Sequence, residues 1–234
     1  MGYGRAPQTP SYNLQSVIDV ESGLIVHHDV YNDAYDSHLL HPMSVATKEV
    51  LEAEELQVLT DGGYSNAEEI ARCEREHIEV AASIKRGAMN SDHFRPAQFI
   101  YDEASDTIRC PAAQTLRPSG LHTRNRAMRY RTSACGSCAL KPRCTPGVQR
   151  TIHRLIDQRA LDRMEARIHA DPSLMTIRQC TVEHPFSTIK RMSSGGRFLT
   201  RGLKAVKAEA ALSILAFNIL HAENVFGTSA ITPS

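Results

Sequence analysis

The stretch LQVLTDGGYSNAEEIARCEREHIEVAASI, residues 56–84, decides the predicted fold. Residues 56–60 are a short apolar run that ends on Asp61 and two glycines, which is typical of a buried strand followed by a turn. A helix is predicted over residues 65–76, with Ser65 or Asn66 as its cap, and another strand over residues 78–84. Strands that alternate with helices predict an α/β sheet.

The segments on either side extend this pattern. Residues 12–19 and 24–30 are predicted to pair as a hairpin around the turn Glu21-Ser22-Gly23, and a helix is predicted over residues 36–51. Three further helices are predicted over residues 151–170, 172–192 and 202–226. The last of them carries an apolar stripe that we interpret as core packing, made of Leu203, Val206, Ala210, Leu212, Ile214, Leu215, Phe217, Ile219 and Leu220.

Residues 85–150 do not follow this pattern. The stretch holds turn residues, scattered aromatics and four cysteines without a sustained period, and it is too long for a simple loop. We therefore expect an insert with its own stabilisation. The predicted organisation is a linker over residues 1–10, a core formed by residues 11–84 and 151–226, the insert over residues 85–150, and a tail over residues 227–234.

The composition excludes several classes of protein. Hydrophobic residues make up 41% and charged residues 23%, as in ordinary globular proteins. No apolar run approaches the ~20 residues that span a bilayer, and the first residues lack the apolar core of a signal peptide. The sequence therefore predicts a cytosolic protein without a membrane partner, whose six cysteines are thiols or metal ligands.

Charge is unevenly distributed along the chain. Residues 1–106 contain 7 Lys or Arg against 19 Asp or Glu, whereas residues 107–156 contain ten Lys or Arg and no acid. Such a stretch is typical of a phosphate-binding surface, and the plainer alternative is a solvated basic loop. The candidate DNA-binding residues in it are Arg117, Arg124, Arg126, Arg129, Arg131, Lys141 and Arg143.

Four cysteines gather in the insert. Cys135 and Cys138 form a C-x2-C pair, Cys144 follows, and Cys110 lies upstream. Because two thiolates at this spacing reach one metal from a turn, the cluster predicts a tetrahedral Zn²⁺ site that would staple the insert. The alternative is four reduced thiols without a metal. Cys73 and Cys180 are interpreted as buried small hydrophobes.

Two carboxylates are candidate catalytic residues. Asp61 ends an apolar strand, where α/β folds place active-site groups. Glu183 lies in the segment TVEHPF, where Thr181 is expected to cap a helix and Pro185 to occupy its first turn. Taken alone, Asp61 is as typical of a turn, and Glu183 of a helix surface.

Several segments together resemble a known family. They are YNLQSVIDVESGLIVHHDV, LTDGGYSNAEEI, CGSCALKPRCT, VEHPFSTIKRM, GGRFLTRGL and AEAALSILAFNI, in that order. They are similar to bacterial insertion-sequence DDE transposases, whose motifs run YNVQ-x-AVD, ADAGY-x-N, C-x2-C-PLK-x2-C and EHPFGTIK. The resemblance extends from about Tyr12 to Asn224.

The resemblance implies an RNase H-like mixed sheet with flanking helices, interrupted by the cysteine-rich insert. It also implies three carboxylates that hold Mg²⁺ or Mn²⁺, of which Asp61 matches the second aspartate and Glu183 the glutamate. Lys190, with Arg191 beside it, matches a basic position that contacts DNA phosphates. The implied function is DNA strand cleavage and transfer at insertion-sequence ends in bacteria, in a cytoplasmic, nucleoid-associated protein.

The chain departs from the family pattern at two places. The family's leading aspartate should precede the hairpin, but none of the eleven residues before Tyr12 is acidic. Gln179 also stands where arginine is usual. We therefore expect an amino-terminally truncated, catalytically impaired copy that does not cleave DNA.

Three hypotheses follow from these departures. An active enzyme would use Asp19 or Asp29 in place of the leading aspartate, although Asp19 is interpreted as a turn residue. A remnant would bind DNA and pair with itself or with a full-length copy, since a missing strand exposes sheet edges. A zinc-stabilised nucleic-acid-binding or regulatory module without enzymatic activity is the alternative from another class.

Overall fold

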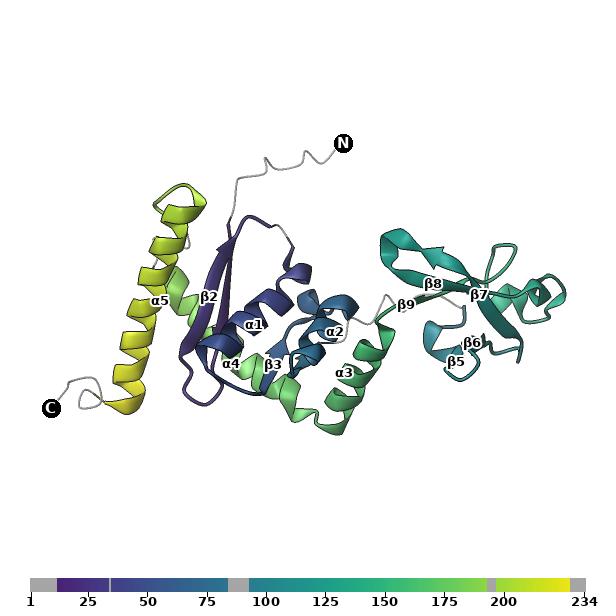
Figure 1. Cartoon of the computed structure of the whole chain (residues 1–234), viewed down its shortest axis with the longest axis horizontal. Coiled ribbons are helices and arrows are strands. Elements are labelled where there is room, and N and C mark those ends of the chain that lie inside the picture. The colour runs from purple at the N-terminus through teal and green to yellow at the C-terminus, as the bar shows by residue number, and fades with distance from the viewer. Residues whose placement is uncertain (1–11, 34, 84–92, 193–196, 228–234) are drawn as a thin grey trace. The chain divides into compact units, whose positions relative to one another are not determined.

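The computed structural model describes residues 12–33, 35–83, 93–192 and 197–227, and the chain divides into two compact units (Figure 1). The first unit comprises residues 1–84 and 162–234, and the second comprises residues 85–161. No helix among the described residues is long and apolar enough to cross a membrane.

The strands are β1 Asn13–Ile18, β2 Ile25–Tyr31, β3 Leu56–Thr60, β4 Ile78–Ala82, β5 Ile100–Asp102, β6 Thr107–Arg109, β7 Thr115–His122, β8 Ala127–Arg131 and β9 Ile152–Leu155. The α-helices are α1 Leu40–Val50, α2 Ala67–Arg75, α3 Gln158–Ala170, α4 Ser173–Met192 and α5 Leu203–Phe226, and the short 3-10 helices are η1 Asp36–His38, η2 Gly62–Tyr64, η3 Pro96–Gln98, η4 Thr123–Asn125, η5 Ser133–Ser137 and η6 Lys141–Arg143.

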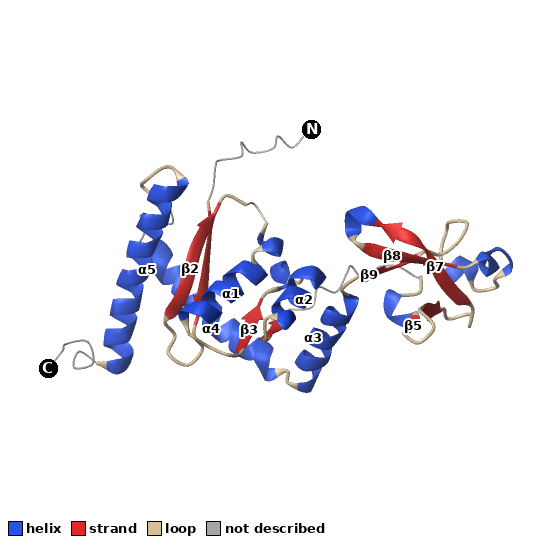
Figure 2. Ribbon diagram, in the orientation of Figure 1, coloured by secondary structure: helices blue, strands red, loops and turns tan. Residues whose placement is uncertain are grey.

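The first unit contains two separate pairs of strands. β1 and β2 form an antiparallel hairpin, and β3 and β4 pair in parallel with α2 between them in sequence. Asn66 caps α2 by accepting a hydrogen bond from the Glu68 N–H. Helices and strands alternate here as the sequence predicts, so the α/β class is confirmed (Figure 2).

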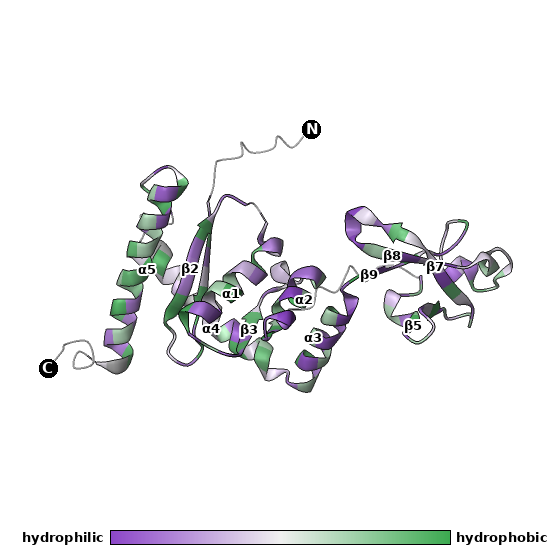
Figure 3. Ribbon diagram, viewed as in Figure 1, coloured by the Kyte–Doolittle hydropathy of each residue, from purple (hydrophilic) through white to green (hydrophobic). Residues whose placement is uncertain are grey.

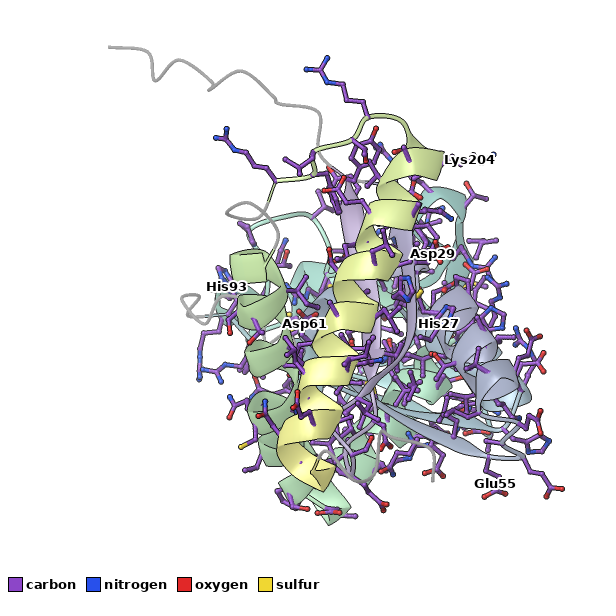
Figure 4. The ribbon with its side chains drawn as sticks, turned by 90° about the vertical axis from the view of Figure 1, so that its left-hand side faces the viewer. His27, Asp29, Glu55, Asp61, His93 and Lys204 are labelled. Atoms are coloured by element: carbon purple, nitrogen blue, oxygen red, sulfur yellow. The ribbon has the colours of Figure 1, made fainter. Side chains whose placement is uncertain are left out.

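Helices cover the strand pairs of the first unit. α1 and α4 lie on opposite sides of the strands (Figures 1 and 4). α5 packs on β2, where Val206 and Ala210 meet Val30 in one buried cluster and Phe217 meets Ile25 in another. Full burial of such an aliphatic or aromatic side chain contributes about 1.5–3 kcal/mol.

The apolar stripe predicted on α5 is only partly core. Val206, Ala210, Ile214 and Phe217 are buried, but four other members of the stripe are exposed. Figure 3 shows hydrophobic residues along much of α5. Those four are Leu212, Leu215, Ile219 and Leu220, between 48% and 68% exposed. The prediction of core packing is wrong for them, because α5 is apolar around its circumference and one face of a helix packs on β2.

The second unit is more regular than its sequence predicts. β5, β6, β7, β8 and β9 form one five-stranded antiparallel sheet in that order. Its core is a cluster of Phe99, Ile108, Leu116 and Tyr130. The expectation of an irregular insert is wrong, and so is the helix expected from residue 151, because β9 pairs with β8 and α3 begins at Gln158.

α4 also begins earlier than its capping signal suggested. Thr181 lies inside the helix, where its hydroxyl donates to the Ile177 carbonyl at 2.8 Å. Pro185 is inside the helix as well, so neither the Thr181 cap nor the first-turn Pro185 is correct. Proline has no N–H to donate to the carbonyl four residues earlier, which is that of Thr181.

Candidate functional site

The first candidate residue, Asp61, directly follows β3. Figure 4 shows it at the opposite end of that strand from Glu55. Its carboxylate accepts a hydrogen bond from the Gly63 N–H at 2.6 Å and so caps η2. The turn therefore fixes an exposed carboxylate at the carboxyl end of a sheet strand.

A second carboxylate, Asp36, is held by a polar network beside this turn. Its Oδ1 accepts hydrogen bonds from Asn13 Nδ2 at 2.6 Å and from Gln15 Nε2 at 3.0 Å. The Tyr64 hydroxyl donates to Gln15 Oε1 and closes the network. Sequence reasoning missed Asp36, Asn13 and Gln15, because their contacts join positions 21–49 residues apart.

Gly63 lies where the two carboxylates meet. A Cβ on this glycine would stand 2.8 Å from Asp61 Oδ1 and 3.8 Å from Asp36 Oδ2. Burial raises the pKa of Tyr64, and the charges of Asp36 and Asp61 raise it further. Both carboxylates are therefore close to the same small turn, and the absence of a side chain at Gly63 leaves room for them.

The remaining residues matched to the family's site lie on α4. Glu183, Lys190 and Arg191 belong to this helix, but their side chains are outside the described part of the chain. Among described residues, no group of three or more His, Cys, Asp or Glu side chains is arranged to hold a metal ion. The pairing of Asp61 with Glu183 therefore stays a prediction.

The two aspartates considered as replacements for a leading aspartate are engaged elsewhere. Asp19 accepts hydrogen bonds from the Ser22 N–H at 2.8 Å and the Ser22 hydroxyl at 2.6 Å, which lower its pKa. Asp29, which is labelled in Figure 4, forms an ion pair with Lys207 of α5 at 2.6 Å. These contacts make Asp19 a turn residue and Asp29 a partner of α5.

Three of the predicted DNA-binding arginines lie on one face of the second unit's sheet. Met128 and Tyr130 of β8 face the core, so the alternate residues Arg129 and Arg131 face away from it. Arg117 of β7 pairs directly with Arg131 in the strand register. Two like charges in directly opposed positions destabilise a sheet unless an anion compensates them.

Two histidines extend this basic face. His153 pairs with Arg129, and its ring lies 5.7 Å from that of His122, edge to face. Neither histidine was predicted as a site residue, because the strands that carry them were not predicted. We name the set Arg117, His122, Arg129, Arg131 and His153 the basic face.

The other predicted cations lie in turns. Arg124 is exposed in η4, and Arg126 follows it and forms an ion pair with Asp157 at 3.4 Å. Lys141 and Arg143 belong to η6, where the Arg143 guanidinium lies 5.3 Å from the centre of the Phe94 ring. These side chains surround the sheet but do not belong to the basic face.

The cysteines of the insert converge on one pocket. Cys110, Cys135, Cys138 and Cys144 all line a small apolar cavity of about 20 Å³. Burial raises the pKa of Cys144; the neighbouring thiols raise it further, and Arg150 lowers it. No group of three or more ligands is arranged to hold a metal ion among the described residues, so the Zn²⁺ site stays a prediction.

The other two cysteines differ from each other. Cys73 is fully buried in α2, as expected, and burial raises its pKa to about 11. Cys180 is exposed on α4, so its interpretation as a buried residue is wrong.

Comparison with known protein families gives one match. Residues 109–221 match the family described as "Transposase DDE domain". Neither the curated proteins nor the solved structures gave a match. The matched segment includes all five residues of the basic face, the cysteines Cys110 to Cys144, and Glu183, so this part of the chain is similar to a transposase DDE domain.

Proposed function

We propose that the chain acts in transposition by binding the DNA of insertion-sequence ends through the basic face. The observation that carries this proposal is the direct pairing of Arg117 with Arg131 on a sheet whose residues 107–156 contain no acid. A phosphate backbone supplies the charges that this surface lacks. The DDE transposase match supports DNA as the polyanion.

The absence of a side chain at Gly120 leaves space for the guanidinium of Arg129. Gly120 has a φ of +122°, and a Cβ there would stand 3.2 Å from Arg129 Nη2. The Arg129 Nε also donates to the Gly120 carbonyl at 3.4 Å. Gly120 therefore keeps the Arg129 guanidinium close to β7, beside the Arg117–Arg131 pair.

DNA affinity at several salt concentrations tests the proposal. Each phosphate contact contributes about 0.9 to the slope of log K against log salt concentration, so replacing Arg117, Arg129 and Arg131 together by alanine should lower the slope by up to ~2.7. The matched control replaces the same three residues by lysine, which keeps the charges and should keep most of the slope. An unchanged slope in the alanine variant would place the DNA contacts elsewhere.

We also propose that Asp61 and Glu183 hold a divalent cation, as the family resemblance implies. The described geometry fits a bound Mg²⁺ ion in one respect. Two carboxylates, Asp61 and Asp36, adjoin a glycine turn, and Mg²⁺ prefers hard oxygen ligands of this kind. When bound, the ion would activate the attacking oxygen and stabilise the leaving oxygen of a phosphoryl transfer. The chain's own residues would position the carboxylates, with Asn13 and Gln15 orienting Asp36.

Measurements of metal affinity and of DNA cleavage distinguish this proposal from a role in DNA binding alone. We expect Mn²⁺ affinity, measured by calorimetry, to fall on Asp61→Asn and on Glu183→Gln, and to change little on Glu55→Gln at the other end of β3. We expect no strand cleavage of insertion-sequence end DNA, since Asp19 and Asp29 are bound to Ser22 and Lys207 and do not supply a third metal ligand. Cleavage abolished by Glu183→Gln would instead support an active enzyme.

A Zn²⁺ ion at the four insert cysteines is a further proposal. The Cys135-x2-Cys138 spacing and the shared pocket support it. One zinc per chain by elemental analysis, lost on Cys138→Ser but kept on Cys180→Ser, is the expected result. A zinc content near zero in the unmodified chain would refute it and leave the thiols as pocket lining.

A further inference from the structure

Helix α5 carries large apolar side chains on the side that points away from the strands. Its buried side, which includes Val206 and Phe217, packs on β2. On the other side Leu212, Leu215 and Ile219 are 68%, 55% and 49% exposed. α5 lies in front of the strands in Figure 4, so this outer side faces the viewer. Large apolar side chains gathered on an outer surface are typical of a face that another molecule covers.

These side chains belong to a line of residues with the spacing of a coiled coil. Six residues follow one another at alternating steps of three and four positions, and we name them the outer seam: Ala205, Ala208, Leu212, Leu215, Ile219 and Ala222. Such steps repeat every seven residues, which is the pattern that lets two helices pack side by side along their length. The four central members are exposed, so the pattern indicates a helix from outside the described part of this unit.

The outer seam is symmetric about its midpoint, which lies midway between Leu212 and Leu215. A two-fold dimer requires a surface that complements itself. Two antiparallel α5 helices meet this requirement, because Leu212 then faces Leu215 of the second copy, and Ala208 faces Ile219. In a parallel pair Ala208 would face Ala208 and Ile219 would face Ile219, which leaves a gap at one end and crowds the other.

The charges at the two ends of α5 favour the same arrangement. Lys204, labelled in Figure 4, lies in a first turn without an acid, and Glu223 lies in a last turn without a base. The dipole of α5 disfavours both charges, because the amino end of a helix attracts anions and the carboxyl end attracts cations. An antiparallel second helix brings its negative carboxyl end to Lys204 and its positive amino end to Glu223, so it compensates both.

We infer that two copies of this chain pair through the outer seam, with their α5 helices antiparallel. Leu212 and Leu215 form the centre of the contact, with Ala208 and Ile219 in the layers on either side. The occupant is a second copy because the spacing, the symmetry of the seam and the end charges all complement themselves. The inference goes beyond the proposed function and does not depend on DNA binding, so it is tested without DNA.

Sedimentation velocity of the full chain at increasing concentration tests the pairing. We expect an equilibrium between monomers and dimers. Leu215→Glu places a carboxylate at the centre of the contact twice, so it should raise the dimer dissociation constant at least about tenfold. The matched control is Leu220→Glu, the same change at a leucine of α5 that is 48% exposed and lies outside the seam. It should leave the dissociation constant within about twofold. Both leucines are exposed, so both variants should keep the fold, as circular dichroism would show.

Photo-cross-linking tests the direction of the helices. A benzoylphenylalanine in place of Lys204 reacts with whatever lies beside the amino end of α5. We expect covalent dimers in which it is joined to residues 219–227 of the second copy, as peptide mapping by mass spectrometry would show. A parallel pair would give cross-links within residues 201–208 instead.

Several results would overturn the inference. They are a chain that stays monomeric at every concentration, equal dissociation constants for Leu215→Glu and Leu220→Glu, and cross-links confined to residues 201–208. Monomers that sediment with phosphatidylcholine–phosphatidylglycerol vesicles would overturn it too, because the seam would then contact a lipid surface and not a second copy.

Discussion

In the second unit each inner strand of the five-stranded sheet has a partner on both sides, whereas in the first unit β1 and β3 each have one partner among the described residues. The second unit buries its apolar residues in a small core made from its own strands, around Leu116 and Tyr130. The first unit keeps a groove of about 640 Å³ between its strand pairs. A five-stranded antiparallel sheet with a basic face is thus joined in one chain to an α/β unit that holds two separate pairs of strands.

The difference shows how the two units use their surfaces. The second unit places its core residues on one sheet face, which frees the other face for cations such as Arg117 and Arg129. The first unit has helices on both sides of its strands, so its open edges face a groove instead of solvent. We expect the second unit to bind its partner by charge.

The largest expected effect concerns the independence of the second unit's core. Leu116 is 1% exposed, so Leu116→Ala should cost about 2–5 kcal/mol of that unit's free energy of unfolding. Amide exchange measured unit by unit should show this loss in β7 and β8 and not in β4. The matched control is Ile100→Ala in β5, where the side chain is 68% exposed and the change should stay within ~0.5 kcal/mol.

Equal destabilisation of both units by Leu116→Ala would contradict the comparison. It would mean that the two units unfold together and that the second unit's core is not self-sufficient.

The next effect tests whether the basic face depends on its backbone. Gly120→Ala places a side chain at φ +122° and 3.2 Å from Arg129 Nη2, so it should cost about 1–3 kcal/mol of stability and weaken DNA binding by displacing Arg129. Gly136→Ala is the matched control, since a Cβ there would meet no atom within 4 Å. Urea unfolding and DNA anisotropy measure the two effects.

If Gly120→Ala and Gly136→Ala bind DNA equally well, Arg129 does not contact the phosphates in the position described. The loss of stability would then report backbone strain alone.

The sequence predicted the first unit far better than the second. The β3–α2–β4 segment has short apolar runs and a clear helix cap at Asn66, and such local signals can be recognised from adjacent residues alone. In the second unit, β5 and β6 have three residues each, and β7 contains Pro118 and Gly120 within its eight residues. Strands this short and interrupted are specified by pairing with distant neighbours, which periodicity does not reveal.

The candidate site residues also differ in whether the sequence predicts them. Asp61 was predicted because a strand end, a carboxylate and two glycines are adjacent in sequence. Asp36 was not, because its closeness to Asp61 arises from hydrogen bonds to Asn13 and Gln15 on a different strand. Composition gave the basic character of residues 107–156, but only the strand register assembles Arg117, Arg131 and His153 into one face.

The smallest expected effect concerns the outer edge of the first unit's hairpin, which α5 covers while β1 faces the groove. Lys207 of α5 forms an ion pair with Asp29 of β2, and both side chains are partly exposed, at 43% and 30%. Burial raises the pKa of Asp29, but hydrogen bonds from Lys207 and the Val30 N–H, with the Lys207 charge, outweigh it and leave the pKa below its usual value. A carboxyl with a lowered folded-state pKa stabilises the fold above its unfolded pKa of about 3.9, and that contribution is lost as the pH falls through the folded value.

Lys207→Met keeps the length of the alkyl chain, so it should cost at most ~1 kcal/mol at pH 7 and progressively less toward pH 2, as measured by urea unfolding. A difference that persists undiminished at pH 2 would show that Lys207 acts through contact of its alkyl chain with β2, and α5 would then hold that edge by packing and not by charge.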